Sequence, residues 1–186
     1  MVNENLNRCM MNHKQEQMGK SFILMGVSST GKTSVGTEVA HRLGIKLIDG
    51  DDLHPRANII KMREGHPLND EDRAPWLERI RDAAFSLERK SEVGIIICSA
   101  LKKKYRDLIR EGNGNVKFLF LEGTFELVLE RMKQRKGHYM KTDMLKSQFE
   151  TLEVPGQDEP DVIHVDISGR FEQVVERCVE ALKPLI

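Results

Sequence analysis

Short apolar runs alternate with longer segments of helical period from Ser21 to the end of the chain. Five of these runs are too short and too apolar to be amphipathic surface helices, and they cover residues 22–25, 46–48, 94–98, 117–121 and 162–165. Runs of this kind are typical of buried strands in a parallel sheet whose strands are joined by helices. The pattern therefore predicts an α/β fold with a five-stranded parallel sheet and helices on both of its faces.

The segments between the strands carry apolar residues at steps of three and four. One stripe consists of Trp76, Ile80, Ala84 and Leu87, and the last segment carries Phe171, Val174, Val175, Cys178 and Leu182. This spacing places each set on one side of a helix. We expect both stripes to face the sheet, although an aromatic residue such as Trp76 can instead lie against a ligand.

The length and charge of the chain limit what it can be. With 186 residues, it can form one domain with one core, which we expect to span residues 19–186, and we expect residues 1–18 to be a disordered extension. Lys and Arg together number 29, as do Asp and Glu. A net charge of zero argues against nucleic acid or an anionic membrane as the partner.

The cysteines and the apolar runs indicate a cellular location. Cys9, Cys98 and Cys178 are odd in number and far apart, which predicts free thiols and a reducing, cytoplasmic compartment. The sequence lacks any apolar run near the roughly 20 residues that a membrane span needs. We therefore expect a cytoplasmic protein without a membrane partner.

A glycine-rich sequence follows the first expected strand and precedes an amphipathic helix. It has the pattern G-x-x-x-x-G-K-[ST], in which backbone N–H groups and a helix N-terminus surround phosphates. Lys32 can reach the β- and γ-phosphates, and the Thr33 hydroxyl can bind Mg²⁺. The expected nucleotide-binding residues are Gly26, Val27, Ser28, Ser29, Thr30, Gly31, Lys32 and Thr33. This P-loop predicts binding of ATP or GTP.

Two carboxylates follow the second expected strand as Asp49-Gly50-Asp51. Ligands of open α/β sheets bind beyond the carboxyl ends of the strands, so this turn is expected beside the P-loop. One carboxylate can hold Mg²⁺ through water, and the other can accept the proton of an attacking hydroxyl. We assign Asp49 as the residue that holds the metal through water and Asp51 as the base that accepts the proton. The alternative is a solvated acidic turn.

Longer motifs resemble those of one kinase family. The sequence reads D-G-D-D-L-H-P at 49–55, N-I-I-K-M at 58–62, P-L-N-D-E-D-R-A-P-W-L at 67–77 and C-S-A-L-K at 98–102. These blocks resemble the gluconokinases, and the likeness extends over residues 20–186. Adenylylsulfate kinases share the D-G-D turn, but the motifs expected of them after the third strand are missing.

The resemblance implies ATP-dependent phosphorylation of D-gluconate to 6-phospho-D-gluconate by a homodimer with the fold of nucleoside-monophosphate kinases. It also implies a short lid in which Arg131 and Arg135 meet the triphosphate, although charge pattern alone favours a solvated basic face. A loop of Ser168, Gly169 and Arg170 is expected to lie against adenine, with Ser168 able to cap the last helix. The substrate-binding residues implied are Asp51, His54, Arg73, Lys102, Arg106 and Gln148.

Three of these cations are candidates for binding the carboxylate of the acceptor. Arg73 opens a helix after the acidic turn, and Lys102 and Arg106 stand four residues apart, as on one helix face. Their convergence would let a neutral protein select an anionic acceptor, because a guanidinium can hold a carboxylate through two hydrogen bonds. Surface ion pairs with Asp72 and Asp107 are the alternative.

Ser29 departs from the family pattern, which more often has glycine at this place. If this position has a positive φ, the serine strains the loop, and the affinity for ATP is expected to fall. A function of another class also remains open, namely an ATP-dependent switch without an acceptor. Such a protein would not need the cluster of Asp51, Arg73, Lys102 and Arg106.

Overall fold

The computed structural model describes residues 18–134 and 142–186 of the chain. Its centre is a sheet of five parallel strands in the order β2-β3-β1-β4-β5. The strands are β1 (Lys20–Met25), β2 (Lys46–Asp49), β3 (Val93–Ile97), β4 (Val116–Glu122) and β5 (Val162–Asp166). All five predicted strands are confirmed, with small differences at their ends.

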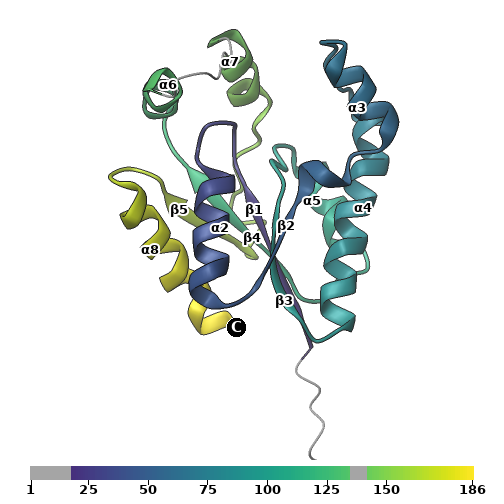
Figure 1. Cartoon of the computed structure of the whole chain (residues 1–186), viewed down its shortest axis with the longest axis vertical. Coiled ribbons are helices and arrows are strands. Elements are labelled where there is room, and N and C mark those ends of the chain that lie inside the picture. The colour runs from purple at the N-terminus through teal and green to yellow at the C-terminus, as the bar shows by residue number, and fades with distance from the viewer. Residues whose placement is uncertain (1–17, 135–141) are drawn as a thin grey trace, which may run out of the picture.

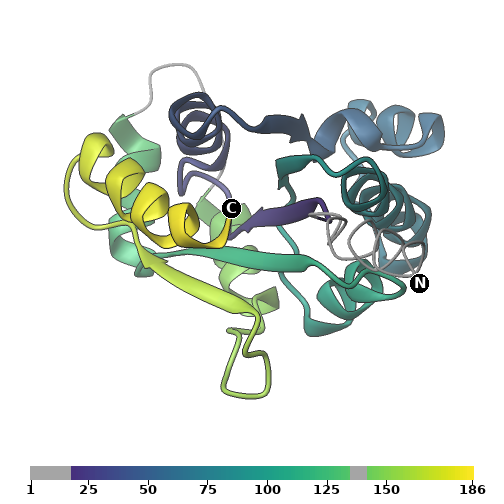
Figure 2. The same ribbon diagram turned by 90° about the horizontal axis from the view of Figure 1, so that it is seen from below.

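Helices cover both faces of the sheet, as Figure 2 shows from below. On one face lie α2 (Lys32–Leu43) and α8 (Phe171–Leu182), and on the other lie α4 (Asp70–Arg89) and α5 (Lys103–Arg110). Alternate residues of β1 enter opposite cores, because successive strand side chains point to opposite faces. Phe22 belongs to the core under α2 and α8, and Ile23 belongs to the core under α4 and α5.

The smaller elements lie above the carboxyl edge of the sheet or at the end of the chain (Figure 1). They are η1 (Gly50–Leu53), α3 (Arg56–Arg63), α6 (Phe125–Gln134), α7 (Thr142–Thr151) and η2 (Lys183–Leu185). The sheet supports these elements from below, so the upper edge is the place where a ligand can be enclosed.

The predicted apolar stripes are buried, with one exception. Trp76 and the three residues that share its stripe are at most 5% exposed, and the stripe of α8 is buried from Val174 onward. Phe171 is 43% exposed, so the prediction that it faces the sheet is wrong. It is the first residue of α8 and precedes the part of the helix that the sheet covers.

The N-terminus of α4 is fixed at the upper edge by a capping box. The Asn69 side chain accepts a hydrogen bond from the Asp72 N–H at 2.8 Å, and the Asp72 carboxylate accepts one from the Asn69 N–H at 2.9 Å. These contacts satisfy backbone groups that would otherwise lack partners at the helix start. They define where the first turn of α4, with Arg73, lies.

Cys98 and Cys178 are buried and form no disulfide, which confirms the prediction of free thiols for these two residues. Burial raises the pKa of each thiol to about 12, so neither ionises near neutral pH. Cys9 lies outside the described residues. None of the described helices has both the length and the apolar character that a membrane span requires.

Candidate active site

A cavity of about 690 Å³ opens at the carboxyl edge of the sheet. Its walls come from the P-loop, the turn after β2, α4, the segment between β3 and α5, α5 itself and α7. β1 has β3 on one side and β4 on the other, so the chain crosses over at the place where ligands of open α/β sheets bind. Of the predicted site residues, the cavity brings together Ser28, Ser29, Gly31, Lys32, Thr33, Asp51, Arg73 and Gln148.

The P-loop has the backbone that its sequence predicts. Gly26 and Gly31 have φ values of 139° and 95°, which favour glycine. Gly31 precedes the first residue of α2, and no side chain caps this helix. The N–H groups at the start of α2 are therefore available to an anion. The Lys32 amine lies along the loop and donates hydrogen bonds to Gly26 O at 2.9 Å and Val27 O at 2.8 Å.

Ser29 adopts a left-handed conformation, with φ at 65°. We expect Ser29→Gly to stabilise the protein by up to about 1 kcal/mol, because glycine removes the strain of a side chain in this conformation. Thermal denaturation followed by circular dichroism measures the change. Ser34→Gly, in the first turn of α2, is the control, since a glycine inside a helix should lower the midpoint instead. A midpoint lowered by Ser29→Gly would contradict the strain.

The acidic turn after β2 gives its two carboxylates different places. Asp49 caps η1, because its carboxylate accepts a hydrogen bond from the Asp51 N–H at 3.0 Å. The Asp51 side chain lines the cavity. Gly50 must be glycine, because a Cβ there would lie 2.0 Å from the backbone oxygen of Ile97. This close packing on β3 holds Asp51 beside the P-loop.

The residues at this edge fit a Mg²⁺ ion that is bound together with nucleotide. Among the described residues, no group of three or more His, Cys, Asp and Glu side chains is arranged to hold a metal ion by itself. Mg²⁺ in kinases typically takes one or two protein oxygens, with phosphate oxygens and waters as its other ligands. The Thr33 hydroxyl and the carboxylates of Asp49 and Asp51 supply oxygens of this type beside the P-loop.

His54 does not line the cavity, contrary to its expected contact with substrate. The residue is 8% exposed, and its ring stacks on the Trp76 indole, with ring centroids 4.3 Å apart. Its Nδ1 lies 3.3 Å from the amide nitrogen of Asn58. Burial lowers the pKa of His54, so its ring is neutral at pH 7. His54 supports Trp76, which is both a core residue and part of the cavity wall.

Arg73 is a cation of the cavity wall without an acidic partner in the part of the chain that the structure describes. One of its guanidinium nitrogens donates to Leu68 O at 2.5 Å, which fixes the side chain at the start of α4. Asp72 does not pair with Arg73, because its carboxylate binds the Lys61 amine at 2.5 Å and the N-cap backbone. The surface ion pair considered for Arg73 is therefore not formed.

Lys102 is engaged outside the cavity. Its amine lies 3.0 and 3.2 Å from the two carboxylate oxygens of Asp70. The same carboxylate accepts hydrogen bonds from the Lys104 amine and the Tyr105 hydroxyl, and these contacts, with that of Lys104 the largest, hold the pKa of Asp70 well below its usual range. The structure thus does not bring Lys102 to the cavity, whereas Tyr105 lines it.

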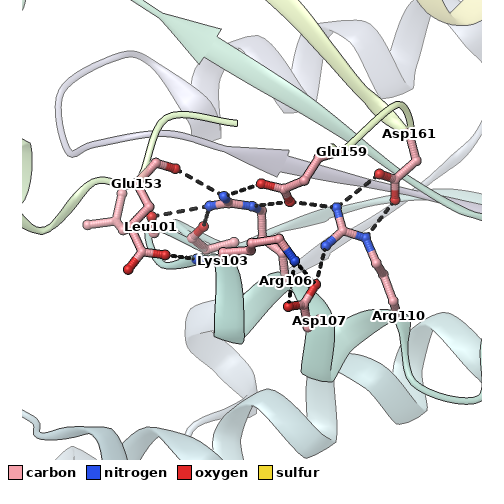
Figure 3. A network of polar contacts seen from close by, with 9 residues as sticks. Leu101, Lys103, Arg106, Asp107, Arg110, Glu153, Glu159 and Asp161 are labelled. Carbon is pink, nitrogen blue, oxygen red and sulfur yellow. Dashed lines mark hydrogen bonds and ion pairs between the residues drawn. The ribbon is translucent and has the colours of Figure 1, made fainter. Parts of the chain in front are cut away.

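Arg106 contradicts the expectation that it binds the acceptor. The side chain is fully buried, and its guanidinium makes five hydrogen bonds (Figure 3). Two go to the carboxylate of Glu159, at 2.6 and 2.7 Å, and the others go to backbone oxygens of Ala100, Leu101 and Glu153. Lys102 precedes the first residue of α5, so the helix face that would carry both cations is not formed.

Arg106→Met should destabilise the protein by about 3 kcal/mol, because it removes two hydrogen bonds from the buried Glu159 carboxylate, which then pairs with Arg110 alone, and removes a donor from three backbone oxygens. Urea denaturation at pH 7 measures this. Lys103→Met removes only an exposed pair with Asp107 and should cost no more than about 0.5 kcal/mol. The double variant Arg106→Met with Glu159→Leu should regain part of the loss. A loss below about 1 kcal/mol for Arg106→Met would contradict the structural role of Arg106.

The same ion pair predicts how stability depends on pH. Hydrogen bonds from Arg106 and, to a lesser extent, from Arg110 lower the pKa of Glu159 from 4.5 to about 2. A carboxyl group with a lowered pKa in the folded state stabilises the protein above its unfolded pKa and loses this contribution as the pH falls through the folded value. We therefore expect Glu159→Gln to reduce the dependence of the free energy of unfolding on pH between about 4.5 and 2.

Four residues of α7 line the cavity, and sequence analysis assigned a role to one of them. They are Met144, Ser147, Gln148 and Thr151. Their successive steps of three, one and three residues place them on one helix face, and this spacing is the signal that could have identified the others. Gln148 contacts the P-loop: its side-chain oxygen accepts from the Ser28 N–H at 2.6 Å, and its amide nitrogen donates to Ser28 Oγ at 2.8 Å.

Arg131 lies beside the loop after β5 and does not line the cavity. Its guanidinium donates to the backbone oxygens of Ile167 and Gly169. Ser168 does not cap α8, since its N–H and hydroxyl donate to the Asp166 carboxylate and Arg170 is the N-cap residue. The guanidinium of Arg131 thus braces the loop that is expected to hold adenine. Arg135 lies outside the described residues.

Comparison with known proteins agrees with this architecture. The family model described as "Shikimate kinase" matches residues 28–183. The thermoresistant and thermosensitive gluconokinases of Escherichia coli are each 55% identical to the chain; the alignments cover 87% and 88% of it and 93% and 88% of the respective relatives. The crystal structure of a gluconokinase from Sinorhizobium meliloti superimposes with a TM-score of 0.80 at 41% identity, over 90% of this chain and 94% of that one.

Proposed function

The chain belongs to the gluconokinase family of P-loop kinases, and we propose that it transfers the γ-phosphoryl group of ATP to the C6 hydroxyl of D-gluconate. The products are ADP and 6-phospho-D-gluconate. One observation carries the proposal: a single cavity contains a P-loop, the carboxylate of Asp51 and a guanidinium, that of Arg73, without an acidic partner among the described residues.

Phosphoryl transfer needs positioning and neutralisation of charge more than covalent chemistry. The N–H groups at the start of α2 bind phosphate oxygens, and Lys32 leaves its backbone partners to contact the β- and γ-phosphates. Asp51 orients the C6 hydroxyl and accepts its proton as the oxygen attacks. Asp51 can do both because it faces the cavity beside the P-loop.

We propose Mg²⁺ as the metal of the reaction, with the Thr33 hydroxyl as its direct protein ligand and Asp49 as a ligand through water. When bound, the ion neutralises part of the charge on the β- and γ-phosphates. Arg131 is proposed to act at the nucleotide, and its contacts with Ile167 and Gly169 favour the adenine side. Arg135 remains a proposed lid residue.

Arg73 is proposed to bind the carboxylate of gluconate. A planar guanidinium can form two parallel hydrogen bonds with a carboxylate. Its place in the first turn of α4 adds the positive end of the helix dipole. Of the three cations considered from the sequence, Arg73 alone both lines the cavity and lacks an acidic partner in the described part of the chain.

The alternatives are less favoured. Adenylylsulfate kinases share the fold, but the curated relatives at 55% identity are gluconokinases. An ATP-dependent switch would not need Asp51, Arg73 and Tyr105 on the wall of the cavity that contains the P-loop. We propose in addition that the chain is cytoplasmic, which its two buried free thiols support. We also propose that it forms a homodimer, as its resemblance to the gluconokinases implies, and sedimentation analysis of the purified protein tests this.

Lys32→Ala should lower kcat at least a hundredfold, because it removes a cation from phosphates in a site that excludes water, where such a contact contributes about 3 kcal/mol. The thermal midpoint should change little, since the amine donates to backbone oxygens of its own loop. Lys46→Ala, at the exposed edge of the sheet, is the control. Near-normal turnover by a folded Lys32→Ala protein would refute the role of Lys32.

The proposed function is tested by release of ADP with a panel of acceptors. D-Gluconate should give the highest kcat/KM, adenylylsulfate and shikimate should give no turnover above background, and omission of the acceptor should leave only slow hydrolysis of ATP. Faster turnover with adenylylsulfate or shikimate would show that this compound, and not gluconate, is the substrate. Equal ADP release with and without any acceptor would favour the switch.

A further inference from the structure

The helix α7 contacts both halves of the proposed active site. Four of its side chains, on one face, form the wall that spans from the P-loop to the acceptor side. Gln148 contacts the P-loop, and the residues just after the helix contact α5. Both contacts involve the C-terminal half of α7 or the segment that follows it, so a shift of this part of the helix disturbs both walls of the cavity.

The contact with the P-loop consists of two hydrogen bonds to one residue. The Ser28 N–H donates to Gln148 Oε1 at 2.6 Å, and Gln148 Nε2 donates to Ser28 Oγ at 2.8 Å. An amide side chain supplies the acceptor and the donor that this pair requires. Ser28 lies between Gly26 and Gly31, in the segment whose N–H groups surround phosphates in this motif. The position of Gln148 therefore depends on the conformation of the nucleotide site.

The contact with the acceptor side is formed by Glu153, which follows α7. Its N–H donates to Leu101 O at 2.9 Å, and its carboxylate accepts from the Lys103 N–H at 2.5 Å. Arg106 donates to Glu153 O at 3.0 Å (Figure 3). Leu101 lines the cavity, and α5 carries Tyr105 on the same wall. The C-terminal end of α7 is thus joined to the acceptor half.

Along its whole length, α7 has few buried side chains. Leu145 is fully buried, and Phe149 packs edge-on against Phe125 with ring centroids 5.4 Å apart. Met144 is 54% exposed although it belongs to the cavity wall. Little apolar burial holds the helix in place, so the polar contacts of Gln148 and Glu153 contribute much of what fixes its position.

We propose that Gln148 is a positioning residue that couples the two subsites, so that nucleotide on the P-loop strengthens the binding of the sugar acid and the sugar acid strengthens the binding of nucleotide. Either ligand that fixes α7 spares the second ligand part of the cost of ordering it. By linkage, the factor is the same in both directions. The inference rests on the proposed function, since it takes gluconate as the acceptor.

The test measures the dissociation constant of D-gluconate with and without nucleotide. Trp76 is the only tryptophan of the chain and lines the cavity, so its fluorescence reports binding, and calorimetry gives an independent value. The nucleotide is the non-hydrolysable β,γ-imido analogue of ATP with Mg²⁺. In the parent protein, the analogue should lower the dissociation constant at least about fivefold, which is the low end of typical coupling.

Two variants separate coupling from a purely structural role. Gln148→Met keeps a good helix former of similar length but neither accepts from the Ser28 N–H nor donates to its hydroxyl, so the ratio of the two dissociation constants should fall below about twofold. Ser28→Ala keeps the hydrogen bond of the N–H and should give an intermediate ratio. A residue that only stabilised the fold would change both constants by the same factor and leave the ratio unaltered.

Lys146→Ala is the matched control, because Lys146 lies on the exposed face of α7. The ratio of the two dissociation constants in this variant should equal that of the parent. A parental ratio in Gln148→Met, or a ratio within about twofold of one in the parent itself, overturns the coupling. In either case, turnover of gluconate by the parent would still support the proposed function. If the parent neither binds nor phosphorylates gluconate, the proposed function fails and the coupling inference fails with it.

Discussion

D-Glucose and D-glucitol should be phosphorylated with a kcat/KM at least about a thousandfold below that of D-gluconate. Both acceptors keep the chain of hydroxyl groups but lack the carboxylate. When either one binds, it removes water from the Arg73 guanidinium and supplies no anion in its place. An unpaired charged group of this kind costs several kcal/mol, and sites that pair with a polar group of the substrate reject analogues without it by comparable factors. D-Glucitol is the stricter comparison, because it is open-chain like gluconate.

Variants at Arg73 determine whether this side chain causes the selectivity. Arg73→Met should lower kcat/KM for gluconate and leave that for glucitol nearly unchanged, so the ratio should shrink. Arg73→Lys should retain part of it, because an ammonium group keeps the charge but not the paired geometry. Arg79→Met, which alters an exposed arginine of the same helix, is the control. A ratio that is unchanged in Arg73→Met would remove Arg73 from recognition of the acid group.

Asp51→Asn should lower kcat by about a thousandfold and leave the binding of gluconate and ATP nearly intact. The amide keeps the shape of the side chain but cannot accept the proton of the attacking hydroxyl, and general bases typically contribute factors of 10² to 10⁴. The loss should therefore appear in kcat, as measured by release of ADP. Binding of gluconate, followed through Trp76, serves as the check on folding and affinity.

The neighbouring aspartates provide the controls for this substitution. Asp52→Asn changes an exposed residue that does not line the cavity and should have little effect. Asp49→Asn keeps an oxygen that can cap η1, so any loss of activity should arise from weaker binding of Mg²⁺. Loss of catalysis in Asp49→Asn together with normal turnover in Asp51→Asn would show that the two roles are reversed.

The fold could be predicted from the sequence because local patterns determine it. Each strand is a short apolar run, and the three inner strands β3, β1 and β4 are largely buried, whereas the edge strands β2 and β5 are partly exposed. Each P-loop residue has its place in a contiguous motif. Even the left-handed conformation of Ser29 could be suspected from its place in the loop. Structural features that are determined by residues nearby in the sequence could therefore be predicted.

Arg106 shows where sequence reasoning fails. Its partner Glu159 is 53 residues away, and nothing in the local pattern distinguishes an arginine buried against a distant carboxylate from one that faces a ligand. The position of the first turn of α5 decided the matter, since Lys102 precedes the helix and does not share a face with Arg106. Helix ends are determined by capping and tertiary contacts, which spacing alone does not show.

The cavity wall from α7 was missed for a related reason. Ser147 and Thr151 are ordinary surface residues by type, and only the placement of α7 over the P-loop gives them a role. His54 illustrates the reverse case, because a residue that invites a contact with substrate stacks on Trp76 behind the cavity wall. The sequence therefore identified the chemistry of the site more reliably than the set of side chains that reach it.

Phosphorus NMR of the reaction mixture tests the transfer itself. With ATP, Mg²⁺ and D-gluconate, the parent protein should produce one new phosphomonoester per ADP, with its phosphorus coupled to the two protons of a primary carbon, as phosphorylation of the C6 hydroxyl requires. Inorganic phosphate as the only new signal, or a phosphomonoester on a secondary hydroxyl, would contradict the account.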